Sequence, residues 1–263
     1  MLNKHIAVIV LAAAFFSYGQ SFALELTGGK SVDITITQTY ASRYISKAQD
    51  CFADDDAAYH PSLDITFPKL ILDTDISLTV WGAFALNSGH EEFDEIDYSV
   101  SASRDMFKYW NVSGGYSYFD YPKANKLADT NDPWGSLTLK KIPYLPIDAS
   151  ITLTAIYQFP AASGGSENGM YYSWGFETVL PLPSAAVFQK DQALTLGVVN
   201  WGTDGVGGLK PSRLYATVFS LGTKYTFGRL AISPNFNYAL NHERRINNGA
   251  EEIWGGIDLS WSF

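Results

Sequence analysis

The sequence has a single cysteine, Cys51, and only four histidines among its 263 residues. One cysteine excludes an intramolecular disulfide and any metal site built from several thiolates. His5 lies in an N-terminal stretch with leader features, which leaves His60, His90 and His242 for any metal centre. The sequence therefore gives little support for a metal site, and we expect neither a metal nor another cofactor.

Charged residues are also scarce, at 17% of the chain, and their balance is acidic, with a formal net charge of −9. An acidic chain lacks the basic face of a general nucleic-acid binder, so nucleic acid is not an expected partner. An apolar content of 46% argues against disorder. Beyond the leader no apolar run approaches the 18 or so residues of a transmembrane helix. Aromatic residues, in contrast, reach 15%.

Residues 1–23 are typical of a secretory signal peptide. Lys4 supplies the positive charge, Ile6–Phe16 the apolar core, and Ser21-Phe22-Ala23 the small residues before the cleavage site. No cysteine follows, which excludes a lipoprotein leader. We expect cleavage near Ala23, which leaves residues 24–263 as one domain.

The rest of the chain alternates with period two, the pattern of strands with two different faces. About twelve segments carry it, beginning with Val32–Tyr44 and ending with Ile253–Phe263. One face is aliphatic and aromatic, whereas the other holds small polar side chains such as Thr35, Thr37 and Ser99. A soluble sandwich would favour Lys, Glu and Arg on its exposed face. The pattern predicts an all-β fold, a transmembrane antiparallel up-and-down β-barrel with apolar residues toward lipid and polar residues toward the lumen.

The connections between segments alternate between short and long, as in outer-membrane barrels with short periplasmic turns and long external loops. The long ones are expected near Lys47–His60, Asn87–Asp94, Asp120–Asp132, Pro160–Asn168, Gly202–Ser212 and Asn241–Glu251. Pro181–Asp191 is an exception, being long for a periplasmic turn. We expect the barrel to lie in the outer membrane. Because the number of strands is even, both termini are then expected on the same side, in the periplasm.

Aromatic residues on the apolar face predict girdles at the membrane interfaces, because their rings are apolar and their tips polar. The expected girdle residues are Tyr172, Trp174, Tyr215, Tyr225, Tyr238 and Trp261. The last strand ends in alternating Ile257, Leu259, Trp261 and Phe263. A terminal strand of this kind resembles the signal by which Gram-negative bacteria recognise barrels for assembly. Expected partners are therefore outer-membrane lipid, lipopolysaccharide and the barrel-assembly machinery.

Several motifs in the first half of the chain resemble the TorF-like family of outer-membrane porins. They are Tyr44–Ala48, His60–Phe67, Val80-Trp81-Gly82, Glu95–Tyr98 and Gly114–Pro122. The resemblance covers roughly Thr39–Pro122, and the family usually has Arg-Gly where this chain has Lys47-Ala48. It implies an outer-membrane barrel with a transport role.

Three functions are compatible with the sequence. Small inward residues favour a narrow, water-filled pore for small hydrophilic solutes. A non-transporting surface barrel, serving adhesion or membrane integrity, is a second possibility. A lipid-modifying enzyme is a third, since His60, His90 and His242 fall in or beside external loops. No serine or acid stands at diagnostic spacing, so we expect no catalytic residues. Cys51, in an acidic loop, is interpreted as inert. The sequence leaves open whether a loop plugs the lumen.

The inward charges predict modest cation selectivity. Counting along the strands places five lumenal charges toward the periplasmic end: Asp75, Lys140, Glu177, Lys224 and Asp258. Asp64 and Asp97 fall near the outer mouth, where the strand count gives them no basic partner. The acidic loop clusters Asp54–Asp56 and Glu91–Glu95 are either solvated charge or divalent-cation sites.

Overall fold

The computed structural model describes residues 31–52, 56–87, 89, 93–124, 126–145, 147–165, 168–182, 192–206 and 212–263. The expected signal peptide, His90 and the acidic residues Asp54, Asp55, Glu91 and Glu92 lie outside these ranges. Within the described residues no helix has the length and apolar character needed to cross a bilayer.

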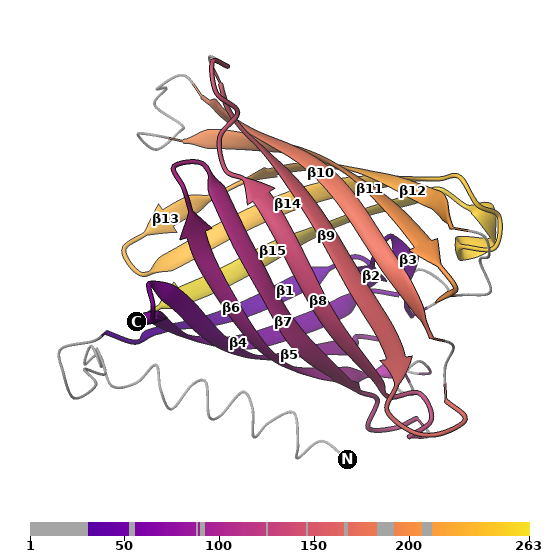
Figure 1. The fold of residues 1–263 in the computed structure, drawn as a ribbon. Helices are drawn as coiled ribbons and strands as arrows, with labels where there is room; N and C mark the ends of the chain where they lie inside the picture. The colour runs from indigo at the N-terminus through magenta and orange to yellow at the C-terminus, as the bar shows by residue number, and fades with distance from the viewer. Residues whose placement is uncertain are drawn as a thin grey trace.

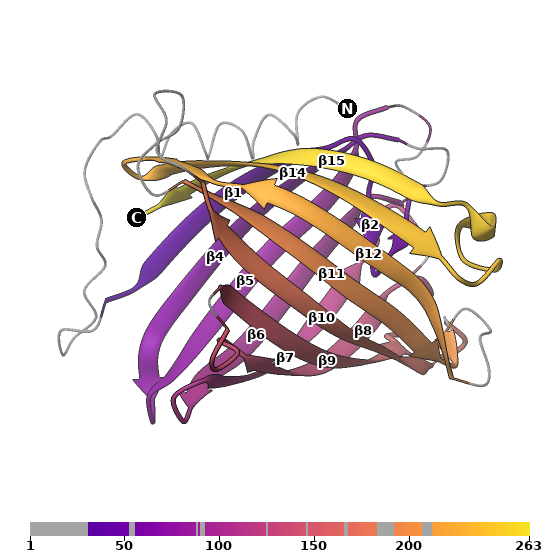
Figure 2. The same cartoon turned by 90° about the horizontal axis from the view of Figure 1, so that it is seen from above.

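Across the described ranges, twelve antiparallel strands form one closed ring (Figures 1 and 2). They are β1 (Asp33–Ala41), β4 (Ala58–Ile71), β5 (Thr74–Ala85), β6 (Glu95–Met106), β7 (Trp110–Asp120), β8 (Thr130–Leu139), β9 (Asp148–Pro160), β10 (Gly169–Pro181), β11 (Ala193–Asp204), β12 (Arg213–Thr223), β14 (Leu230–Asn241) and β15 (Glu252–Ser262). Consecutive strands pair, and the pairing of β1 with β15 closes the ring. The short β13 (Tyr225–Phe227) pairs with β14. The expected all-β, twelve-stranded barrel is confirmed.

The two faces of each strand differ as the alternation predicts. On one face, hydroxyls of neighbouring strands hydrogen-bond in pairs: Thr37 with Ser260 at 3.0 Å, and Ser99 with Ser117 at 2.7 Å. On the other, large apolar side chains lie open, and Leu153 is 49% exposed. An apolar belt of this extent suits a hydrocarbon environment rather than water.

Both described ends of the barrel chain lie at the same end of the cylinder. The Phe263 N–H donates to the Ile34 carbonyl at 2.9 Å. The short connections, such as the two residues between β4 and β5, also lie at this end, and the long ones lie at the other (Figure 1). The connection expected as a long exception joins β10, which ends at Pro181, to β11, which begins at Ala193, and residues 183–191 lie outside the described ranges.

Two strand boundaries differ from the sequence expectation. The first barrel strand ends at Ala41 instead of Tyr44, and β4 begins at Ala58, so His60 belongs to the wall and not to a loop. The reason is that the chain between them leaves the ring and enters the barrel. There it forms the two short strands β2 (Ile45–Ser46) and β3 (Gln49–Asp50), which pair with each other.

Candidate functional site

Residues 42–52, here called the lumenal hairpin, cross the barrel interior. The hairpin leaves the wall between β1 and β4, yet Lys47 at its tip reaches the opposite wall. Lys47 Nζ lies 2.8 Å from Asp132 Oδ2 on β8 and 4.8 Å from the Tyr171 ring on β10. In the ring order, β8 and β10 stand opposite β1 and β4. Twelve strands spaced ~4.8 Å apart and tilted ~40° enclose a backbone diameter of about 24 Å, which the hairpin spans.

These contacts also identify the inward face. Asp132, Tyr171 and Trp81 meet the hairpin, and each shares the face of the small polar residues on its own strand. The polar face is therefore the lumenal one, and the apolar belt faces outward.

The hairpin tip has an uncommon backbone. Lys47 and Ala48, which join β2 to β3, have φ values of +49° and +61°. Two positive φ angles are typical of the tightest hairpin turns, where Asn and Gly are favoured because other residues are strained there. The turn is held by Tyr215, whose hydroxyl donates to the Lys47 carbonyl at 2.5 Å, and by Asn247, whose amide donates to the Ala48 carbonyl at 3.2 Å. Strain maintained by long-range contacts often marks a functional position.

Lys47 is the cation of a buried acidic site. The side chains of Lys47 and Asp132 are 16% and 2% exposed. Burial alone would lower the pKa of Lys47, but the Asp132 carboxylate outweighs it and holds that pKa above its ordinary value. Lys47 also interacts electrostatically with Glu95 and Asp97. Strand counting gives Asp97 no basic neighbour because Lys47 comes from a loop, and the ion pair of Lys47 is with Asp132.

The base of the hairpin is packed against the wall. The Tyr44 ring lies 5.1 Å from Phe52, 5.0 Å from His60 and 5.7 Å from Trp81, measured between ring centroids. Its hydroxyl donates to Glu95 Oε2 at 3.0 Å. Arg43 forms an ion pair with Glu252 on β15. Together with the tip, these contacts fasten the hairpin at both ends.

Cys51 is half-buried and packs against this base. Burial, followed by the charge of Glu95, raises the pKa of the Cys51 thiol to about 12. At neutral pH the thiol therefore stays protonated, which suppresses its reactivity while the hairpin is docked.

Tyr215 was expected in the lipid-facing girdle, and the structure contradicts this. Its side chain is 0% exposed and packs with Tyr171, Ala48 and Ile246 inside the barrel. The pairing of β11 with β12 shifts at this point, where Trp201 pairs with Ala216 and Gly202 with Leu214. The extra residue turns Tyr215 to the other face, because a bulge breaks strict alternation.

Two of the other expected girdle residues carry polar contacts at their hydroxyl tips. Tyr172 stacks on Trp174 at 6.3 Å and hydrogen-bonds Ser212, while Tyr238 donates to Glu251 at 2.6 Å. Tyr225 and Trp261 lie near the end of the barrel that carries the short turns. Tyr225 pairs with Ile232, and Trp261 pairs with Leu230 on one side and Ile36 on the other.

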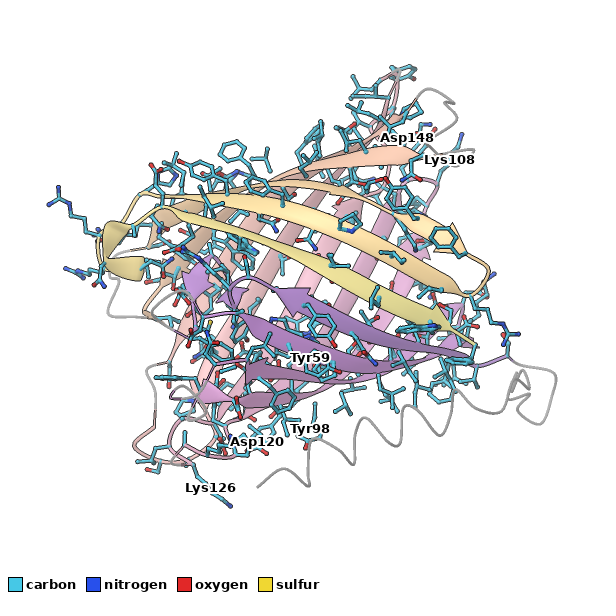
Figure 3. The ribbon with its side chains drawn as sticks, turned by 180° about the vertical axis from the view of Figure 1, so that it is seen from behind. Tyr59, Tyr98, Lys108, Asp120, Lys126 and Asp148 are labelled. Atoms are coloured by element: carbon cyan, nitrogen blue, oxygen red, sulfur yellow. The ribbon has the colours of Figure 1, made fainter. Side chains whose placement is uncertain are left out.

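Further outward tyrosines, not included in the sequence prediction, lie toward the long loops. The Tyr40 and Tyr59 rings are 5.1 Å apart, and those of Tyr98 and Tyr118 are 6.5 Å apart (Tyr59 and Tyr98 are labelled in Figure 3). Tyr118 donates to Asp129 at 2.8 Å. Their alternating spacing was visible in the sequence, but their common height on the barrel depends on strand register.

The five charges expected toward the short-turn end do not form one cluster. Lys140 pairs with Asp105 at 2.6 Å, the Asp75 carboxylate accepts the Lys69 N–H, and Asp258 accepts the Thr39 hydroxyl. The two remaining members are Glu177 and Lys224. All five are described, and no ion pair joins any two of them. Nearer the middle of the wall, Asp64 accepts hydrogen bonds from Ser62 and Thr79.

The last strand completes the ring. Within β15, Ile257 pairs with Tyr40, Leu259 with Gln38 and Trp261 with Ile36. Phe263 follows directly and bonds β1 through its N–H. This geometry places the expected assembly signal on the strand that closes the barrel.

The described histidines and loop carboxylates lie in different parts of the barrel and have separate partners. His60 lies inside the barrel, whereas His242 Nε2 is 2.9 Å from Thr217 on the outward face. Asp56 accepts the Asn87 amide and Asp94 pairs with Lys123. Within the described ranges, no group of three or more His, Cys, Asp or Glu side chains is placed to hold a metal ion.

Solved structures with a similar fold are outer-membrane proteins. A KdgM porin is 11% identical, with 87% of this chain and 99% of that chain covered and a TM-score of 0.52. A NanC porin is 12% identical, covering 87% and 98%, with a TM-score of 0.51. A bacterial polysaccharide outer-membrane secretin is 7% identical, covering 88% and 98%, with a TM-score of 0.52. At these identities the likeness establishes the fold alone.

No protein-family model and no curated protein matches the chain. The resemblance to the TorF-like family therefore rests on its motifs, and what the structural likeness supports is the outer-membrane barrel.

Proposed function

We propose that this protein is an outer-membrane pore for small hydrophilic solutes, constricted by the lumenal hairpin. The observation that carries the proposal is the contact between Lys47 and the wall opposite its own loop. Both termini then lie in the periplasm and the hairpin near the outer mouth, since the short turns share the end of Phe263. The fold it shares with two porins is consistent with this role.

The wall away from the hairpin suits a water-filled channel. Its inward residues are small and polar or lack a side chain altogether, as with Thr35, Ser262, Ser220 and Gly222. A twelve-stranded barrel lined by such residues leaves room for water, whereas bulky inward residues would fill it. Transport, and not catalysis, is the role that we assign.

The lumen should favour cations. Arg43 and Lys47 of the hairpin pair with the inward carboxylates of Glu252 and Asp132, whereas Asp64, in the middle of the wall, accepts hydrogen bonds from Ser62 and Thr79 and has no ion pair among the described residues. This surplus of acid gives the lumen a negative potential that attracts cations, more strongly at low salt.

Single-channel recording in planar bilayers tests the pore and its constriction together. The comparison is between the native chain and a variant in which Ile45–Asp50 is replaced by a short Gly-Ser linker. We expect conductance from both, and a severalfold larger conductance from the variant. Silence from both folded proteins would overturn the pore, and equal conductance would overturn the constriction.

The reversal potential under a KCl gradient tests selectivity. Cation preference should weaken when Asp64 and Asp97 are both changed to Asn, whereas an Asp33→Asn change at the short-turn end serves as the matched control. Anion preference in the native protein would refute the assignment of charge to the lumen.

Insertion from the periplasm by the assembly machinery, after cleavage near Ala23, belongs to the same proposal. So does contact of the outer leaflet, made of lipopolysaccharide, with the tyrosines near the long loops. The aromatic pair Tyr40–Tyr59 supports this contact, because rings with polar tips prefer membrane interfaces.

A further inference from the structure

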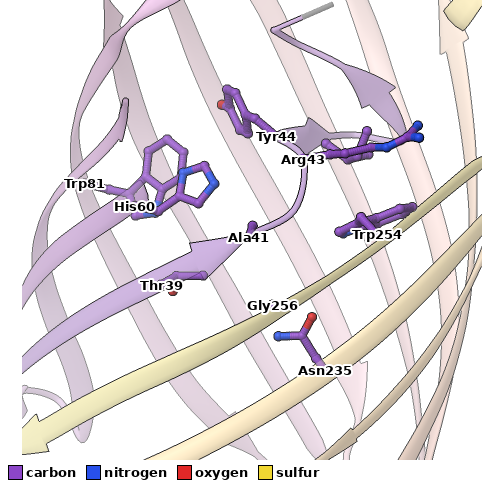
Figure 4. A pocket seen from close by; sticks show the side chains of 10 residues that line it. Thr39, Ala41, Arg43, Tyr44, His60, Trp81, Asn235, Trp254 and Gly256 are labelled. Atoms are coloured by element: carbon purple, nitrogen blue, oxygen red, sulfur yellow. The ribbon is translucent and has the colours of Figure 1, made fainter. Parts of the chain in front are cut away.

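A cavity of about 220 Å³ lies between the hairpin base and the barrel wall (Figure 4). A single water needs only ~10–15 Å³ of such space, so the cavity has room for a ring-sized solute. Its lining joins the hairpin residues Arg43 and Tyr44 to Trp81 and Trp254 on the wall. The cavity therefore exists only because the hairpin is folded inward.

Aromatic side chains form two walls of this cavity. His60 and Trp81 stack on each other with centroids 4.9 Å apart and planes within 13°. Trp254 lies on the other side, below Arg43, with Ala41 between the two groups and Asn235 beneath them (Figure 4). Flat aromatic surfaces of this kind pack against flat ligands with apolar faces.

The polar group offered to the cavity comes from Asn235. His60 is 7% exposed and its Nδ1 is itself buried, so His60 contributes an aromatic surface and not a polar atom. Asn235, a lining residue, accepts from Asn237 through Oδ1, and its Nδ2 lies 3.5 Å from where a Cβ of Gly256, another lining residue, would stand. An amide N–H in such a lining can donate to a ligand hydroxyl.

Gly256 keeps the floor of the cavity open. A Cβ at this position would lie 3.5 Å from Asn235 Nδ2 and 3.1 Å from the Tyr40 carbonyl. Any larger side chain would project into the space in front of the amide.

The lining is electrically balanced. Arg43 is the charged side chain that lines the cavity, and it is already paired with Glu252. An anionic ligand would have to compete with that carboxylate, and a cationic one would meet Arg43. The site therefore favours a neutral ligand.

From these features we propose that the cavity binds one neutral sugar ring of a passing solute. A pyranose has apolar C–H faces that suit the aromatic walls, and hydroxyls that can accept a hydrogen bond from the Asn235 amide. This assignment names the class of solute that the proposed pore would pass, and it rests on that proposal. Binding itself can be measured without conductance.

Tryptophan fluorescence of the detergent-purified protein, titrated with D-glucose, tests the site because Trp81 and Trp254 line it. We expect a saturable change in the native protein and none in Gly256→Leu. Thr152→Leu is the matched control, since it places the same side chain on the inward face of β9, across the barrel from β15, at a residue that does not line the cavity. Asn235→Leu, of similar size, should weaken the response roughly tenfold through one lost hydrogen bond and covers the case in which Gly256→Leu fails to fold.

No saturable response to D-glucose in the native protein, or an equal response in Asn235→Leu, would overturn the proposal. An equal or stronger fluorescence response to D-glucuronate, which is anionic, would overturn the assignment of a neutral sugar as the ligand. Binding without conductance would retain the site and reject the pore, whereas conductance without binding would do the reverse.

Discussion

The strongest prediction concerns the ion pair at the hairpin tip. Replacing Lys47 by Met keeps an apolar stem against Tyr171 and Phe119 but removes the cation that faces Asp132. Asp132 is 2% exposed, so its carboxylate would remain buried without that partner. We expect the hairpin to leave the opposite wall more often as a result.

The magnitude follows from burial. Breaking a buried ion pair from one side costs about 3–5 kcal/mol. The lower end applies here, because Lys47 is 16% exposed and water can reach part of the site. About 3 kcal/mol raises the ratio of released to docked hairpin roughly 150-fold, since each ~1.4 kcal/mol is a factor of ten.

Cys51 provides the assay. It is the only cysteine of the sequence, and docking raises the pKa of its thiol to about 12. A released hairpin returns the thiol toward its ordinary pKa near 8.5, where the reactive thiolate is accessible. When opening and closing are fast, the rate of alkylation follows the released fraction. Alkylation at pH 8 should therefore accelerate by about two orders of magnitude in Lys47→Met.

Lys140→Met is the matched control. Lys140 also contacts a carboxylate, Asp105, at 2.6 Å, but the two side chains are 41% and 59% exposed. An exposed pair of this kind contributes ~0–1 kcal/mol, so the alkylation rate of Cys51 should stay near the native value. Adding Asp132→Asn to Lys47→Met should slow alkylation again, because the double variant no longer buries an unpaired carboxylate at position 132. Native-like alkylation of Lys47→Met would refute the docking role of the pair.

Three further predictions concern the turn, the outer face and assembly. Ala48→Gly should stabilise the docked hairpin by about 1 kcal/mol, because glycine adopts positive φ without strain, and should slow alkylation of Cys51 about fivefold. Phe219→Arg, on the outward face where Phe219 is 43% exposed, should cost roughly 2–4 kcal/mol in urea unfolding from lipid vesicles, whereas Ser220→Arg on the inward face should cost much less. Equal costs would mean that the faces of β12 are reversed. Deletion of Phe263 should lower the amount of folded barrel in the outer membrane, as judged by surface labelling, because the last strand closes the ring and removes both edges; normal surface levels would contradict this role.

The fold was predictable because its signal is local. Alternation with period two depends on neighbouring residues, and consecutive strands of a barrel pair with each other, so strand number and order follow from the chain itself. The outward direction of Leu153 and Phe219 and the closing role of β15 could be deduced in this way. Alternation failed at Tyr215, because one extra residue in β12 reverses the face and leaves no mark in composition.

The candidate site could not be predicted in the same way, because it is built from contacts between residues that are far apart in the sequence. Its motif around Lys47-Ala48 resembled a porin family, but nothing in that motif says that the loop turns inward. Lys47 meets Asp132 across 85 positions, and its carbonyl meets Tyr215 across 168. Local alternation thus determined the barrel and its two faces. Tertiary structure decided what fills the lumen, because the buried charge of Asp132 and the hydroxyl of Tyr215 come into reach only after the ring has closed.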